Sequence, residues 1–331
     1  MSTLRMKDIA AEAGVSVTAV SFFLNGKAKR YGLSTSTCDR ISRTVEKHHF
    51  SPNFQAKAVK SGRTYLIGMV INAVHGSFWM DVISGIEERI EKAGYHLILV
   101  TLRGSVSREE RVVRFLFDKG ADGFIYVPQV ISNAFHLAQL LPLANEKPLV
   151  AINANMPQIS SVCTNEWEGG YLAAAHFLQK GHRRLAYIGS LAPYMRGQAF
   201  RTELSHEGLA CMHFETVSDF MPHARQFSGV FCFSDFLVLE LYDKARQLNL
   251  RIPEELSVIG YDDMHFASCI CPPLTTIRQL KKEIGIEAAE LLLARLETPT
   301  AECIPPAKSI LPVSLIARDS VFDLTPVNCQ A

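Results

Sequence analysis

Side chains that suit contacts with a nucleic acid gather in the first thirty residues of the chain. Lys27, Lys29 and Arg30 offer positive charge to phosphates, a contact that positions a protein without reading sequence. Val17 and Thr18 offer an apolar contact to a thymine methyl and one hydroxyl to a base edge. The alternative for the three cations is a solvated charge cluster.

A pair of short helices is the element that the surrounding sequence predicts. Apolar residues recur at helical spacing over residues 7–13, and Gly14 supplies the permissive backbone of a tight turn. Ser16 can cap a second helix over residues 17–24, which buries an apolar face around Val20. Two such helices form a helix-turn-helix unit, whose second helix can enter a DNA major groove. For this stretch alone, an ordinary αα-hairpin is the alternative.

The distribution of charge favours DNA binding. The 331-residue chain has a net charge of only +1, but residues 1–64 hold eleven Lys and Arg against four acids, a balance of +7. The remaining residues hold 23 basic and 29 acidic side chains, a balance of −6. A basic head on an acidic body indicates that the head binds a polyanion, which the body itself repels.

Composition and motif content disfavour several other classes of protein. The apolar fraction of 48% is a globular value, and the length suits two or three domains. Without an apolar signal segment or a run of eighteen apolar residues, a cytoplasmic protein without a membrane partner is expected. The only close cysteine pair, Cys269 and Cys271, favours incidental thiols over a metal or redox site, so neither metal nor cofactor is expected. HExxH, GxSxG, P-loop and GxGxxG motifs are absent, so no enzyme is predicted.

A basic linker follows the helix pair. Ser34 predicts the N-cap of a third helix, and the Ser-Pro-Asn run at residues 51–53 ends it. Residues 54–60 suit one or two helical turns with Lys57 and Lys60, a length at which an isolated helix is marginal. We therefore expect this segment to order only on DNA.

From residue 64 the pattern predicts strands alternating with helices. The first series has strands at 66–71, 96–102, 123–127 and 149–152, with helices at 78–93, 109–119 and 134–143 between them. A second series begins at Val162 and continues to a strand at 256–261, and a helix at 281–297 and a strand at 309–318 come late. Alternation of this kind predicts doubly wound parallel sheets in two lobes, with ligands in the cleft between them.

Short motifs recur along the chain in the order of one known family. In the head and hinge they are Lys7-Asp-Ile-Ala, Ala13-Gly-Val-Ser16, Val20-Ser21, Leu24-Asn-Gly26, Asn53, Ala56, Lys57 and Ser61-Gly-Arg-Thr64. In the body they include Gly85-Ile-Glu87, Asp122-Gly123, Glu168-Gly-Gly-Tyr171, Gly181-His-Arg183, Ser257-Val-Ile-Gly-Tyr-Asp-Asp263 and Pro272-Pro-Leu-Thr-Thr-Ile-Arg-Gln279. With these motifs the sequence resembles the lactose-repressor (LacI/GalR) family of bacterial transcription regulators over nearly its whole length.

The resemblance implies a small all-α helix-turn-helix head and an α/β core of two lobes, like a type I periplasmic binding protein. It gives a DNA-binding domain at 1–50, a hinge helix or linker at 51–64 and an effector-binding and dimerisation core at 65–331. Lobe 1 would cover about 65–161 and 278–299, and lobe 2 about 162–277 and 300–320. The implied partners are double-stranded operator DNA, a second copy of the chain and a small effector, a sugar or related metabolite.

The resemblance also assigns DNA-contacting residues in the head and hinge. They are Lys7, Ser16, Val17, Thr18, Ser21, Phe22, Asn25, Lys27, Lys29, Arg30, Asn53, Ala56, Lys57, Val59 and Lys60. Phe22 departs from the usual Arg and cannot make that residue's bidentate guanine contact, so thymine contact or local deformation is expected to replace it. The alternative is that Phe22 packs on the hinge or the loop. Val59 replaces the usual Leu wedge, which predicts a shallower kink in the operator.

The effector site implied by the resemblance consists of Phe78, Trp79, Asn165, Arg196, Asp235 and Asp262. Phe78 and Trp79 suit stacking on a sugar or base, or else they close the core beneath their loop. Arg196 with the two aspartates suits binding of hydroxyls or a carboxylate, or else forms an inter-lobe salt bridge without a ligand.

One segment is shorter than usual for the family: Asp235 follows Gly189 by only 46 positions. We expect it to lack most of a strand–helix unit, with remnants at 209–217 and 221–227. The favoured function is an effector-responsive repressor. A DNA-binding regulator with a degenerate, effector-independent core is the second hypothesis. A sugar-binding transport component is disfavoured by the basic head and the missing signal peptide.

Overall fold

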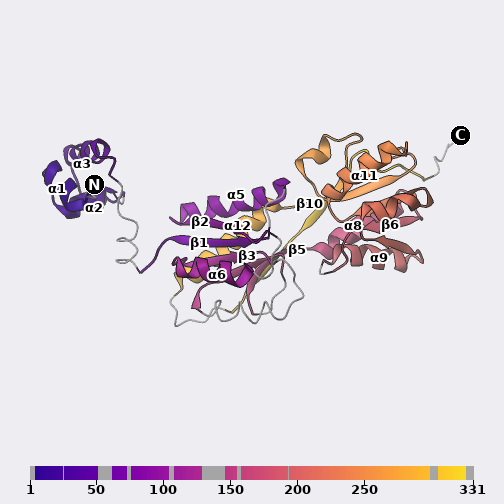
Figure 1. Cartoon of the computed structure of the whole chain (residues 1–331), viewed down its shortest axis with the longest axis horizontal. Helices are drawn as coiled ribbons and strands as arrows, with labels where there is room; N and C mark the ends of the chain where they lie inside the picture. Colours follow the sequence, from indigo (N-terminus) through magenta and orange to yellow (C-terminus); the bar gives the residue numbers. More distant parts are fainter. Residues whose placement is uncertain are drawn as a thin grey trace. The chain divides into compact units, whose positions relative to one another are not determined.

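The computed structural model describes residues 4–24, 26–50, 62–72, 76–103, 108–128, 146–154, 158–192, 194–298 and 305–325. The chain divides into two compact units, Met1–Tyr65 and Leu66–Ala331 (Figure 1). The predicted helix at 134–143 and the predicted hinge helix at 54–60 lie outside the described residues.

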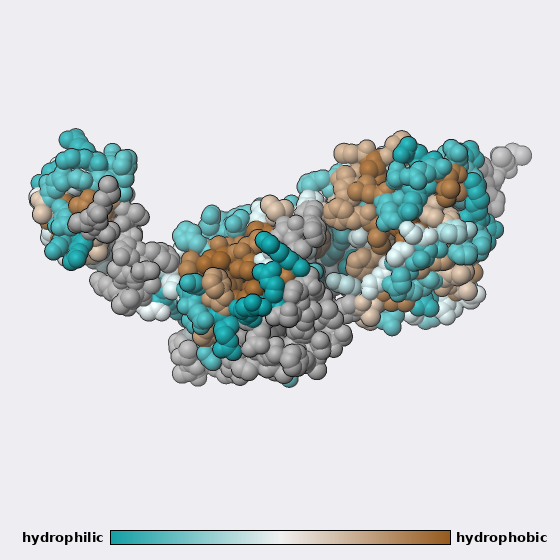
Figure 2. Space-filling view, viewed as in Figure 1, coloured by the Kyte–Doolittle hydropathy of each residue, from teal (hydrophilic) through white to brown (hydrophobic). Residues whose placement is uncertain are grey.

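The first unit, the head, is built from three helices. They are α1 (Met6–Ala13), α2 (Val17–Leu24) and α3 (Thr35–Lys47). Their apolar faces meet in a small core of Ile9, Ala10, Ala13, Val20 and Ile41. The visible face of the head is mostly hydrophilic, as expected for a unit with so small a core (Figure 2).

The turn and caps of the head form as the residue types predict. Gly14 is left-handed with φ of 63°, a conformation that costs glycine little. The Ser16 Oγ accepts a hydrogen bond of 3.1 Å from the Ala19 N–H at the start of α2. Ser34 caps α3 in the same way, accepting from Thr37 at 3.2 Å. The predicted helix-turn-helix is confirmed.

The second unit contains two lobes, and the first holds a six-stranded parallel sheet of order β11-β5-β4-β3-β1-β2. Its strands are β1 (Leu66–Ile71), β2 (His96–Thr101), β3 (Gly123–Tyr126), β4 (Leu149–Ile152), β5 (Ser160–Thr164) and β11 (Lys308–Leu311). Helices α5 (Gly76–Lys92) and α12 (Lys281–Glu297) pack together on one face, and α6 (Glu109–Asp118) covers the other (Figure 1).

The second lobe holds a sheet of order β12-β10-β9-β8-β6-β7, parallel except for β12. Its strands are β6 (Leu185–Ile188), β7 (Cys211–Phe214), β8 (Gly229–Cys232), β9 (Ser257–Asp262), β10 (Thr275–Gln279) and β12 (Val313–Ile316). One face carries α8 (Glu166–Gln179) and α9 (Arg196–His206). The other carries α10 (Val217–Phe220), the 3₁₀ helix η2 (Met221–Gln226) and α11 (Asp235–Gln247), and η3 (His265–Ser268) follows β9. The predicted two-lobed α/β core is confirmed.

Two predicted boundaries are wrong. Val162 was expected to open the second lobe, but it lies in β5 and pairs with Ile152 of the first sheet. The predicted strand at 309–318 is two strands in different lobes, interrupted at Pro312. A buried strand pattern does not say which sheet it joins, and proline cannot donate the hydrogen bond that would continue a ladder. The chain therefore passes between lobes after Thr164, after Gln279 and at Pro312.

The short segment between Gly189 and Asp235 contains α9 and β7, but the helical part that follows β7 is short. Strand β7, expected as a remnant, pairs with β6 and forms the edge of the second sheet. The helical part is reduced to the four residues of α10 and the six of η2. Phe220 and Phe227 from these turns still bury their rings against the core.

Candidate functional site

The exposed face of α2 presents two of the side chains predicted to contact DNA. Val17 and Thr18 are exposed at the start of α2, and 44% of Val17 is accessible although it is apolar. Lys7 is exposed on α1, whereas Ser21 is half-buried. Ser16 is exposed, but its hydroxyl oxygen accepts the capping hydrogen bond of α2. These placements leave Val17 and Thr18 best presented for reading bases.

Phe22 packs on the loop that follows α2. Its ring stacks on Tyr31 with centroids 3.8 Å apart and planes 4° apart. This is the packing alternative for Phe22. Tyr31 was not predicted to take part in the site, although an aromatic residue within a basic loop was a usable signal.

The cations of this loop are all exposed. Lys27, Lys29 and Arg30 surround a turn in which the Tyr31 N–H bonds the Lys27 carbonyl at 3.1 Å. Their placement suits phosphate contacts. Asn25, Asn53, Ala56, Lys57, Val59 and Lys60 lie outside the described residues, so their assignments stay predictions.

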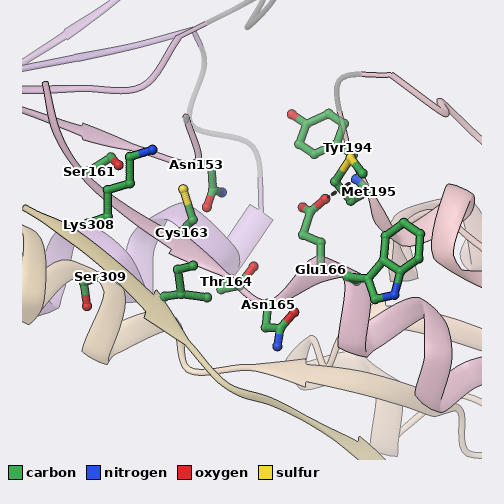
Figure 3. A pocket seen from close by; sticks show the side chains of 12 residues that line it. Asn153, Ser161, Cys163, Thr164, Asn165, Glu166, Tyr194, Met195, Lys308 and Ser309 are labelled. Carbon is green, nitrogen blue, oxygen red and sulfur yellow. Dashed lines mark hydrogen bonds between the residues drawn. The ribbon is translucent and has the colours of Figure 1, made fainter. Parts of the chain in front are cut away.

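A cavity of about 410 Å³ opens where the chain passes between the two lobes. The first lobe contributes Asn153, Ser161, Cys163, Thr164, Lys308, Ser309 and Ile310, and the second contributes Asn165, Glu166, Trp167, Tyr194 and Met195. Figure 3 shows Cys163, Asn153 and Lys308 on one side, facing Glu166 and Tyr194 on the other. This volume and mixed lining are typical of small-molecule sites.

Asn165 is the one predicted effector residue that lines this cavity. It is also the N-cap of α8, with its Oδ1 accepting from the Glu168 N–H at 3.2 Å. Its Nδ2 donates to the Glu168 carboxylate at 2.9 Å. A ligand would therefore meet an amide that is already held in place.

Arg196 is buried beside the cavity in an ion pair within the second lobe. Its guanidinium donates to Glu166 and to the Phe233 carbonyl, and lies 3.8 Å from Asp262. It also lies 3.7 Å from the ring centroid of Tyr261. Burial alone would lower the pKa of Arg196, but the neighbouring carboxylates outweigh it and raise the pKa. The salt bridge joins elements of one lobe, so the inter-lobe alternative is wrong in that respect.

Asp262 joins this ion pair to the ends of β5 and β10, where the chain passes between the lobes. Its Oδ1 accepts from Gln279 Nε2 at 2.7 Å, and Gln279 Oε1 accepts from Thr164 Oγ1 at 2.9 Å. Lys281 donates to the carbonyls of Asp262 and Asp263 at 2.8 Å each. Burial raises the pKa of Asp262 to about 6. These bonds link residues on both sides of the lobe boundary.

Asp235 is a fully buried structural residue. Its carboxylate accepts from the Met264 N–H at 2.8 Å and from Thr276 Oγ1 at 2.7 Å. Burial, together with the charge of Asp262, raises the pKa of Asp235 to about 8. Asp235 is buried and does not line the cavity, although the resemblance assigned it to the effector site.

Phe78 and Trp79 pack against each other at the start of α5. Their ring centroids lie 5.1 Å apart with planes at 81°, and Phe78 is 9% exposed. Neither residue lines the cavity, which fits their predicted core alternative better than stacking on a ligand.

The cavity also contains residues that were not predicted from the sequence. Asn153 directly follows β4, and the rule that ligands lie beyond the carboxyl ends of strands was signal enough to find it. Glu166 stands two positions past the end of β5 and obeys the same rule, but its pairing with Arg196, thirty positions away, had no signal in the sequence.

The described part of the chain does not offer a metal site. There, no group of three or more His, Cys, Asp and Glu side chains is placed to hold a metal ion. Cys269 and Cys271 are free and exposed. No helix among the described residues is long and apolar enough to cross a membrane.

Comparisons with known proteins agree with this architecture. Residues 5–53 match the family model of bacterial regulatory proteins, lacI family, and residues 174–321 match a periplasmic binding protein-like domain. The HTH-type transcriptional repressor PurR of Aliivibrio fischeri is 30% identical, over 88% of this chain and 91% of the relative.

Solved structures show the same fold. The lac repressor dimer bound to operator and an anti-inducer matches with a TM-score of 0.82 at 21% identity, over 97% of this chain and 100% of that one. A LacI family regulator from Enterococcus faecalis with bound ribose matches with a TM-score of 0.69 at 27% identity, over 78% of this chain and 100% of that one.

A helix-turn-helix head followed by a two-lobed binding core defines a DNA-binding transcription regulator. The chain belongs to the LacI family of bacterial regulatory proteins.

Proposed function

We propose that this protein is a cytoplasmic repressor that binds a near-palindromic operator as a homodimer. Its affinity for DNA would change when a small effector, a sugar or related metabolite, occupies the cavity between the lobes. The observation that carries the proposal is the cavity lined by both lobes, in a chain that also has a helix-turn-helix head. A ligand that touches both lobes favours one arrangement of them, which is how binding can be coupled to a second site.

The relatives support this proposal. One is a transcriptional repressor, one is a dimer bound to operator, and one holds ribose. A dimer with two-fold symmetry presents two copies of α2, and these require two half-sites of matching symmetry in the DNA.

Tryptophan fluorescence offers a direct test of the effector. The chain has two tryptophans, of which Trp167 lines the cavity and Trp79 does not. In full-length Trp79→Phe protein, titration with ribose, other sugars, nucleosides and small acids should change the emission of Trp167. A binding compound should also raise the melting temperature, by linkage. The matched Trp167→Phe variant should show the thermal shift with little change in emission.

Selection from random duplex DNA tests the operator. The full-length protein should enrich a near-palindromic sequence, and sedimentation should show two chains on each duplex. Enrichment of a single unrepeated half-site, or no enrichment, would contradict the homodimeric repressor.

An effector-independent regulator is the second candidate. It is favoured by the reduced helix between β7 and β8 and by the ion pair that already occupies Arg196. Enrichment of an operator, together with no thermal or fluorescence response across the ligand panel, would favour this candidate.

A further inference from the structure

The loop after α2 is held at three points. The Lys27 N–H donates to the Phe22 carbonyl at 2.8 Å, which joins the loop to the end of α2. The Leu33 N–H donates to the Ala28 carbonyl at 3.0 Å, and the Leu33 side chain packs on the core of the head. Between these ends, the Tyr31 ring stacks on Phe22.

The ring stack joins the loop to α2 through side chains. It lies between the two backbone hydrogen bonds that hold the ends of the loop. Half of Tyr31 is exposed, so its ring is held mainly by Phe22 and is not part of the buried core. The Arg30 guanidinium lies 5.9 Å from the Tyr31 ring centroid, within reach of a weak cation–π contact. The cation next to Tyr31 is thus tied to the same stack.

A held loop binds phosphates better than a free one. Ordering a flexible cation on binding costs conformational entropy, and a loop that is already fixed avoids that cost. Lys27, Lys29 and Arg30 are all exposed on this short turn. Holding the turn therefore fixes the backbone positions from which the three charged side chains extend.

We propose that Tyr31 is a positioning residue for DNA binding, which stacks on Phe22 and so holds the cations of the loop in register with the recognition helix. Phe22 then acts chiefly as the platform for this loop. This inference rests on the proposed DNA binding and deepens it. It also accounts for an aromatic residue at a position where base reading was expected from the sequence.

The test combines Tyr31 variants with neutralisation of the loop. Fluorescence anisotropy would measure the affinity of the full-length protein for the selected duplex and for a scrambled duplex, over a series of salt concentrations. The variants are Tyr31→Ala, the matched control Tyr31→Phe, and the triple variant Lys27→Ala, Lys29→Ala and Arg30→Ala in the wild-type and Tyr31→Ala backgrounds.

Tyr31→Ala should weaken binding to both duplexes by about three- to tenfold, taking the stabilisation of an aromatic pair as the cost of releasing the loop. It should also flatten the salt dependence, by about one unit of slope for each phosphate that the loop no longer neutralises. Tyr31→Phe should stay close to the wild type because it keeps the ring. The triple variant should cost clearly less in the Tyr31→Ala background, because those charges are already displaced.

Three outcomes would overturn the inference. One is an unchanged salt slope in Tyr31→Ala, and another is the same cost of the triple variant in both backgrounds. The third is a loss in Tyr31→Phe equal to that in Tyr31→Ala, which would assign the role to the hydroxyl.

Two further measurements keep the test independent of folding and of the proposed function. Phe22→Leu keeps an apolar residue in α2 but removes the ring, so it should reproduce Tyr31→Ala, and a wild-type salt slope there would contradict the stack. Hydrogen exchange should show reduced protection at Tyr31 and Leu33 with helix α3 unchanged, whereas reduced protection throughout the head would assign Tyr31 to stability instead. If the wild type bound no DNA, both proposals would fail, whereas wild-type binding with unaffected variants would remove only this one.

Discussion

At the scale of single residues, Asp235 is a carboxyl group whose buried environment opposes its ordinary ionisation. Burial raises its pKa from 3.8 to about 8, so the folded chain keeps a proton that the unfolded chain has released over this range. Because the folded state binds more protons there, the free energy of unfolding should fall as the pH rises through the window. Asp262, whose pKa burial raises to about 6, adds to the same fall in its acidic half.

Urea unfolding from about pH 5 to about pH 9 would measure this dependence. Asp235→Asn should flatten it, because the amide can still accept from the Met264 N–H and can donate to Thr276 Oγ1, but carries no titrating proton. Asp243→Asn, at an exposed position of the same helix α11, is the control and should keep the wild-type profile. A profile of Asp235→Asn that parallels the wild type would contradict the assignment.

At the scale of elements, α5 and α12 pack with their backbones in close contact. A Cβ on Gly85 would lie 2.1 Å from the Lys282 carbonyl oxygen, and one on Gly285 would lie 2.0 Å from the Val82 carbonyl oxygen. Since neither atom belongs to a flexible side chain, the helices would have to move apart to admit even a methyl group.

We therefore expect Gly85→Ala and Gly285→Ala each to lower the stability of the core by about 1–3 kcal/mol, the usual cost of overpacking. Alanine favours an isolated helix over glycine, so the sign of the effect separates packing from helix propensity. Urea unfolding measures it, with Ser84→Ala at an exposed position of α5 as control. Glycine variants as stable as the control would show that the helices separate without cost.

At the scale of the whole core, Gln279 lies where two segments pass between the lobes. Through Thr164 and Asp262 it joins the end of β5 in one sheet to β9 in the other. All three side chains are buried, so removing the amide leaves a hydroxyl and a carboxylate without that partner.

Gln279→Met keeps the volume and removes both hydrogen bonds. It should lower the free energy of unfolding by about 2–4 kcal/mol, since one of the two partners left behind is a carboxylate. Chemical denaturation provides the measurement, and the exposed Gln247→Met is the control, expected to change stability by less than about 0.5 kcal/mol. Equal stability of the two variants would mean that water replaces the missing bonds.

Much of the fold was readable from residue patterns. Gly14 and Ser16 set the turn and cap of the head by local backbone chemistry, and the strands of the first lobe appear as continuous apolar runs. The pattern failed at Val162 and Pro312, where the question was which sheet a strand joins. That choice depends on neighbours far away in the chain, such as Ile152 for Val162.

The candidate sites were less predictable than the fold. The exposed face of α2 follows from helical periodicity, so the exposure of Val17 and Thr18 was predictable, and their contact with bases stays a prediction. Arg196 and Asp262 lie near each other, as expected from the sequence. Their bonds to Glu166 and Gln279 depend on contacts between separate elements, which the sequence does not reveal.

The sequence alone determined the basic helix-turn-helix head and the two α/β lobes, because these follow from local periodicity, turn chemistry and charge, and the ordered motifs that resemble the LacI/GalR family indicated the class of protein. Only the tertiary structure decided that Phe22 supports Tyr31, that Asp235 is buried away from the cavity, and that Asn165 lines it with Asn153 and Glu166. Local patterns set which elements form, whereas the surroundings of a side chain depend on packing between residues distant in the chain.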